Sequence, residues 1–69
     1  MIQLTKPQGE QFAEDIHGRG PEHAIASLLY ESGGSLEIEE IMETLKIVDP
    51  NRARMYLGSL RSKGYIREM

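Results

Sequence analysis

Apolar residues recur every three or four positions along three stretches of the chain. This spacing places them on one face of an α-helix, so the pattern predicts three amphipathic helices over residues 21–31, 37–46 and 50–63. The apolar positions are, in chain order, Ala24, Ile25, Leu28 and Leu29, then Ile38, Ile41, Met42 and Leu45, then Ala53, Leu57 and Leu60.

Residues that start or stop helices flank these stretches. Pro21 suits the first turn of a helix, and Gly33 can take the left-handed conformation that ends one. Asp49 followed by Pro50 is a strong start signal, because the carboxylate can cap the helix and proline fits its first position. Gly64 closes the last helix. Between the second and third helices, residues 46–48 should form a short turn with buried apolar side chains.

The remaining segments predict a small sheet and one further helix. Residues 1–5 and 65–69 alternate between apolar and polar, which is typical of strands, and residues 35–36 can be extended. Phe12 and Ile16 are four residues apart and favour a short helix near residues 8–17, although Gly9 weakens it. Gly18 to Pro21 forms a break. We therefore expect a mainly α fold with a small β-sheet, made of an N-terminal extension over 1–20 and a domain over 21–69.

The same patterns predict which side chains form the core. The expected members are Ile25, Leu28, Leu29, Leu36, Ile41, Leu45, Leu57, Leu60 and Ile66.

Size and composition narrow the class of protein. With 69 residues there is room for one small domain, and without cysteine it has neither a disulfide nor a thiolate metal site. No apolar run is long enough for a membrane span, and no signal peptide is visible. The expected protein is cytoplasmic, with no contact to membranes.

Charge is distributed very unevenly. The net charge is −3, yet five of the eight basic residues follow position 50, at Arg52, Arg54, Arg61, Lys63 and Arg67. Residues 1–50 contain three basic and ten acidic residues, whereas residues 51–69 contain only one acid, Glu68. A local concentration of arginine on one helix is typical of a nucleic-acid-binding surface.

The order of elements and two sequence segments resemble the winged helix-turn-helix family. The segments are Leu36–Leu45 and Leu57–Ile66; the second carries the family's spacing of two leucines, a glycine, an apolar residue and isoleucine at Leu57, Leu60, Gly64, Tyr65 and Ile66. The resemblance covers residues 21–67. It implies a three-helix core in which the helices at 37–46 and 50–63 form the helix-turn-helix, and in which the latter enters the DNA major groove.

The resemblance also implies which residues contact DNA. Arginine can bind guanine and asparagine can bind adenine, each through two hydrogen bonds. The outward positions of the last helix are Asn51, Arg52, Arg54, Met55, Ser59 and Arg61, with Tyr56 at the boundary between core and DNA face. Lys63 and Arg67 suit phosphate contacts. The implied function is sequence-specific binding of double-stranded DNA, in a small transcriptional regulator.

One part of the family pattern is incomplete. A full wing has two strands after the third helix, whereas here only one strand follows before Met69. Residues 2–5 could supply the second strand, either within the chain or to a partner. An exposed edge strand attracts a second copy, so we expect a homodimer in which residues 1–20 take part.

Other chemistries have weaker support in the sequence. The acidic residues Glu37, Glu39, Glu40 and Glu43 are expected to be a solvated helix face, because no other metal ligand shares their spacing. His17 and His23 do not make a closed zinc site on their own. No serine has a histidine and acid arranged for nucleophilic catalysis. We therefore expect no enzyme, metal, cofactor or small-molecule ligand. The alternative function is a winged-helix module that binds protein without DNA, through the acidic helix or the N-terminal segment.

Overall fold

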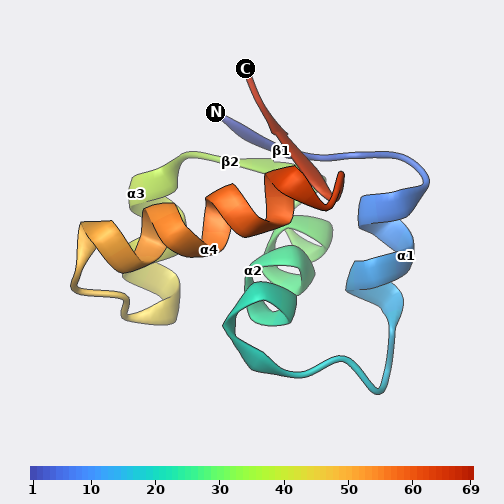
Figure 1. Ribbon diagram of the computed structural model, residues 1–69, viewed down its shortest axis with the longest axis horizontal. Coiled ribbons are helices and arrows are strands. Elements are labelled where there is room, and N and C mark those ends of the chain that lie inside the picture. The colour runs from blue at the N-terminus through green and yellow to red at the C-terminus, as the bar shows by residue number, and fades with distance from the viewer.

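Four helices and a three-stranded antiparallel sheet make up the computed structural model, which describes residues 1–69 (Figure 1). The prediction of a mainly helical fold with a small sheet is confirmed. The elements are β1 (Ile2–Leu4), α1 (Gln8–Glu14), α2 (Gly20–Glu31), β2 (Ser35–Leu36), α3 (Ile38–Leu45), α4 (Pro50–Ser62) and β3 (Ile66–Glu68). No helix is long and apolar enough to cross a membrane.

The N-terminal strand lies at the centre of the sheet, in the order β2-β1-β3. Ile2 pairs with Leu36 of β2, and Leu4 pairs with Ile66 of β3. The sequence left open whether residues 2–5 pair with the last strand of the same chain or with a partner. The structure shows that they pair within the chain. Both edges of β1 form hydrogen bonds inside the molecule, so this strand offers no free edge to a second copy.

The two ends of the chain lie side by side (Figure 1). The backbone N–H of Met69 donates to the carbonyl oxygen of Met1 at 2.9 Å, and the N-terminal ammonium donates to the Met69 carbonyl oxygen at 3.1 Å.

A core of apolar side chains connects the sheet with the helices. Ile25, Leu29, Ile41 and Leu60 have no exposed surface, and Leu57 and Ile66 are buried beside them, as expected. The other expected members, Leu28, Leu36 and Leu45, are partly buried and pack against this core. Ile2, Leu4 and Ala26 also belong to it, although the periodicity did not mark them as core. Residues 1–20 thus contribute both a strand and a helix to the packed structure.

Two apolar side chains lie in solvent where the sequence predicted an inward position. Val48 is 92% exposed, so the prediction of a wholly buried 46–48 turn is wrong, although Ile47 does pack against the core. Ile16 is 89% exposed, because α1 ends at Glu14 instead of continuing to residue 17. The backbone becomes extended at Asp15, whose carboxylate accepts a hydrogen bond from the backbone N–H of His17.

The cap before α4 and the glycines after α2 and α4 have the roles that the sequence predicts. The Asp49 carboxylate accepts a 2.9 Å hydrogen bond from the backbone N–H of Asn51 and so caps α4. Gly33 after α2 and Gly64 after α4 have φ of +90° and +82°, a region that glycine enters without steric cost. Asp49 and Gly64, at the two ends of α4, therefore set where this helix begins and where the chain turns toward β3.

The short helix α1 is fixed by aromatic packing and by close backbone contact. The Phe12 ring stacks on Tyr65 with centroids 4.3 Å apart and meets the His23 ring edge-on at 5.4 Å. A Cβ atom at Gly9 would lie 2.1 Å from the Tyr65 carbonyl oxygen. Glycine at position 9 therefore allows α1 to approach the segment that joins α4 to β3.

Candidate nucleic-acid interface

Helix α4 carries three of the eight basic residues and lies across the front of the molecule (Figure 1). It packs against α2, α3 and β3, and its buried side chains are Ala53, Leu57 and Leu60. The Asp49 cap and the proline at the first helical position fix where this inward face begins. The opposite side of the helix is left in solvent, as the 68% exposure of Met55 shows.

The outermost positions of α4 are uncharged. Residues that lie about four, seven and eleven positions apart share one helix face; here these are Asn51, Met55, Gly58 and Ser62. A Cβ atom at Gly58 would meet nothing within 4 Å, so packing within the chain does not require glycine there. This outer face has small or unbranched side chains that let another molecule approach the helix closely.

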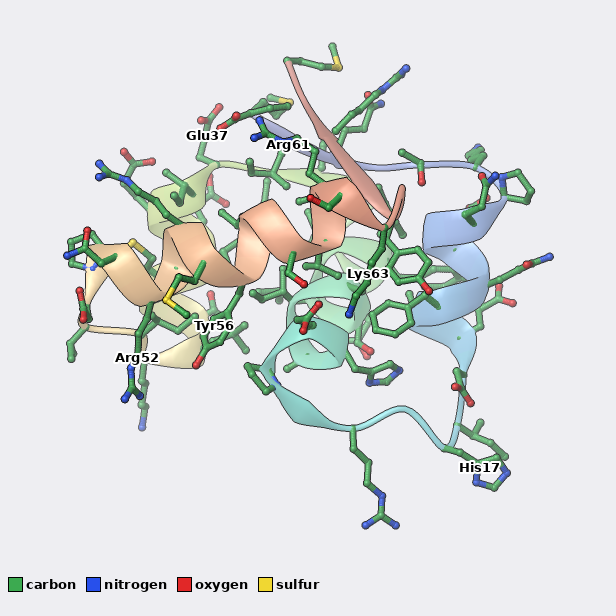
Figure 2. The ribbon with its side chains drawn as sticks, in the orientation of Figure 1. His17, Glu37, Arg52, Tyr56, Arg61 and Lys63 are labelled. Atoms are coloured by element: carbon green, nitrogen blue, oxygen red, sulfur yellow. The ribbon has the colours of Figure 1, made fainter.

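One flank of α4 carries Arg54 and Arg61, which are two helical turns apart. Both line a groove of about 430 Å³ between α4 and the sheet, whose other walls include Ile38 of α3 and Glu68 of β3. Arg61 forms an ion pair with Glu68 at 3.5 Å, with both side chains more than half exposed. In Figure 2, Arg61 points toward the same edge of the molecule as Glu37.

The other flank carries Arg52, Tyr56 and Lys63, which Figure 2 shows along the opposite edge of α4. Tyr56 is half-buried, and Arg52 and Tyr56 line a hollow of about 350 Å³ together with Lys46 from the preceding turn. The side chains of Arg52 and Arg54 are exposed, and neither forms an ion pair. The cations of α4 therefore lie on two flanks, with the uncharged outer face between them.

Two of the residues expected at the DNA are bound to α2. The Glu22 carboxylate accepts a 2.9 Å hydrogen bond from the Ser59 hydroxyl and a 3.0 Å hydrogen bond from the Lys63 ammonium. These two donors, the lysine first, lower the pKa of Glu22 below its ordinary value of 4.5. Ser59 is half-buried, and it lies toward α2 instead of at the outermost position.

Arg67 lies on β3, away from the helix. Its guanidinium donates to the Gln3 side-chain oxygen at 2.8 Å, across the β1–β3 pair. The structure thus places Arg67 on the sheet, and seven of the nine expected contact residues on or beside the solvent side of α4. Those seven are Asn51, Arg52, Arg54, Met55, Tyr56, Arg61 and Lys63.

The other candidate groups are dispersed. His17 is exposed in the loop after α1, whereas His23 is half-buried on α2 beside Phe12. The structure contains no group of three or more histidine or acidic side chains that could hold a metal ion. Glu39, Glu40 and Glu43 of α3 are exposed, and Glu37 forms an ion pair with the N-terminal ammonium at 3.7 Å.

Sequence reasoning missed two residues at this interface. Lys46 has a left-handed backbone conformation with φ of 57°, which brings its side chain to the hollow beside Arg52. Gly58 lies on the outer face, where its lack of a side chain leaves the helix backbone open. The helical spacing from Asn51 and Met55 could have identified Gly58, but nothing in the sequence specifies the turn conformation of Lys46.

Comparison with known proteins gave no match to any family model, curated protein or solved structure.

Proposed function

We propose that this chain is a winged helix-turn-helix domain that binds double-stranded DNA in a sequence-specific manner, in a small transcriptional regulator. In this proposal α3 and α4 form the helix-turn-helix, and α4 enters the major groove. The observation that carries it is the pair of exposed, unpaired guanidiniums of Arg52 and Arg54, one on each flank of the uncharged outer face of α4.

The dimensions of α4 suit this role. Its 13 residues make a helix about 20 Å long, and the major groove is about 12 Å wide and admits one helix. In this arrangement the outer face meets the floor of the groove, where Asn51 can read adenine and Met55 can contact a thymine methyl group. Arg52 and Arg54 reach guanine edges or phosphates on the two sides.

The sheet supports the same assignment. In the winged-helix family a strand pair follows the third helix, and here β3 follows α4 and pairs with β1. In this proposal the N-terminal strand takes the place that a second wing strand has in the family. In this proposal Arg67 on β3 and Lys63 at the end of α4 contact phosphates, and Lys63 exchanges its present partner Glu22 for the DNA backbone.

Net charge limits how such a protein can bind. At −3 the whole molecule is repelled by DNA at long range, and screening at physiological salt restricts attraction to about 8 Å. Binding therefore depends on the α4 cations at short range. The affinity should fall steeply as salt is added, because each phosphate contact releases counterions.

Substitution of Arg52 and Arg54 by alanine tests the proposal. Each change should weaken binding to a selected duplex by about 1–3 kcal/mol, measured by gel shift or fluorescence anisotropy after selection from a randomised duplex library. Circular dichroism should stay unchanged, because both side chains are exposed. The control is Arg19→Ala, which removes the same charge from the loop before α2. Equal affinity of the double variant and the wild type would refute the proposal.

A further inference from the structure

We propose that α3 and the turn after it form a docking groove for a basic amphipathic helix of a partner protein. The groove is shallow and wide open to solvent, with a volume of about 560 Å³, and it is lined by Glu39, Met42 and Glu43 of α3 and by Lys46, Ile47 and Val48 of the turn. This acidic-apolar groove does not include the outer face of α4, although Lys46, Ile47 and Val48 also line the hollow beside Arg52. The inference does not depend on DNA binding.

The backbone of the turn places apolar surface in this groove. Lys46 takes a left-handed conformation, and the Ile47 N–H donates to the Met42 carbonyl oxygen at 2.8 Å, which ends α3. The next two side chains then point to different places. Ile47 packs partly against the core, whereas Val48 is 92% exposed, the largest exposure among the large hydrophobic residues.

No other part of the chain covers the apolar side chains of this groove. Half-buried Met42 lies beside Ile47 and Val48, and methionine adapts its shape readily to a partner. Contact with an apolar stripe would remove Val48 from water, which is favourable in proportion to the area buried.

Charge at the rim selects the chemistry of the occupant. Glu39 and Glu43 are four residues apart on α3, so their charges repel each other on the same side of the helix. Neither lies within ion-pair distance of a basic side chain, and Lys46 is the one cation that lines the groove beside these two acids. A partner with lysine or arginine beside its apolar stripe would neutralise both carboxylates while its stripe covers Met42, Ile47 and Val48.

A helix of a partner fits better than a second copy of the chain. Eight residues of α3 give a wall about 12 Å long, which matches two turns of a helix laid in a groove, a common recognition mode. The chain's own basic helix, α4, offers one exposed apolar side chain, Met55, between its arginines. It therefore lacks the apolar stripe that the groove would accept.

The test uses the full chain labelled with ¹⁵N and two designed peptides. The first peptide is a helix with a leucine stripe flanked by lysines, and the second has the same composition in an order that forms no stripe. NMR titration with the first should shift the amide signals of the groove residues, with smaller changes at α1 and β3. The scrambled peptide should bind at least about tenfold more weakly if the apolar stripe contributes as expected.

Matched variants separate the groove from general attraction to an acidic protein. Val48→Ser should weaken binding by about tenfold, whereas Ile16→Ser, at a similarly exposed apolar residue, should not. The double change Glu39→Gln and Glu43→Gln should weaken binding and flatten its salt dependence; Glu31→Gln on α2 is the control. Wild-type affinity in Val48→Ser, shifts centred elsewhere, or equal binding of both peptides would overturn the proposal. Self-association of the chain that buries Val48 would assign the groove to a second copy instead.

Discussion

Single glycines show how the same residue can have opposite structural roles in this chain. Gly58 lies on the solvent side of α4, where an added Cβ meets nothing within 4 Å. Glycine costs a helix interior about 0.5–1 kcal/mol relative to alanine. Gly58→Ala should therefore raise the free energy of unfolding by about that amount, measured by urea denaturation. A lower stability would show that the outer face of α4 is packed against something in the chain.

Gly9→Ala is the matched comparison. There the added Cβ would lie 2.1 Å from the Tyr65 carbonyl oxygen, a backbone atom that cannot move without disturbing the segment between α4 and β3. We expect clear destabilisation and weaker docking of α1. Near-UV circular dichroism should report the loss of the stacking between Phe12 and Tyr65.

The link between Glu22 and α4 should make stability depend on pH in a defined direction. The lowered pKa of Glu22 means that the ionised form is preferred in the folded state. Its contribution is therefore present above the ordinary value of 4.5 and is lost as the pH falls through the lowered pKa. Because the pair is partly exposed, the contribution should be about 0–1 kcal/mol.

Comparison of the wild type with Glu22→Gln measures this contribution. The difference in unfolding free energy should be constant from neutral pH down to about pH 5 and should shrink in stronger acid, where the wild-type carboxyl is also neutral. Glu31→Gln, at an exposed acid of the same helix, should show no such change. A difference that grows in acid would contradict the assigned ion pair.

At the scale of elements, β1 should be as important to stability as the helices. Ile2 is 3% exposed at the centre of the sheet, and Ile2→Ala should cost about 2–5 kcal/mol. A domain of this size has only a few kcal/mol of stability, so the variant should be largely unfolded at room temperature. Val48→Ala removes a side chain that is 92% exposed and should leave the melting temperature unchanged. Equal melting temperatures for Ile2→Ala and the wild type would remove β1 from the core.

The sequence predicted elements whose signals are local. Asp49 and Pro50 mark the start of α4, and Gly33 and Gly64 mark helix ends. The apolar period identifies Ile25, Leu29 and Leu60 as core residues. These signals could be recognised because each depends only on residues within a few helical turns. The position of β1 between β2 and β3 depends on contacts more than thirty residues apart, and no local pattern contains that information.

The candidate interface was predictable to a similar extent. Helical spacing places Arg52 and Arg54 in solvent, as observed. It does not reveal the ion pairs that reach across elements, from Lys63 to Glu22 and from Arg61 to Glu68. Val48 was misplaced for a related reason, since a left-handed residue at position 46 changes the direction of every side chain in the turn.

For the whole molecule, the proposed function predicts a stoichiometry on DNA. One α4 helix reads only a short site, and two copies related by a two-fold axis would read a palindrome with half-sites about 10 base pairs apart. The mass of the complex with such a duplex, measured by sedimentation, should correspond to two chains. Both edges of β1 are paired within the chain, so we do not expect this strand to join the copies. Saturation of the palindrome by a single chain would contradict the two-copy arrangement.

The central place of β1 has a consequence for how the protein is made. The ribosome synthesises Ile2–Leu4 before both partners of this strand, which follow at Ser35–Leu36 and Ile66–Glu68. The three-stranded sheet can close only after residue 68 has left the ribosome, and until then Leu4 lacks its partner Ile66. A nascent chain stopped before β3 should therefore be a better substrate for chaperones and proteases than a chain that includes β3.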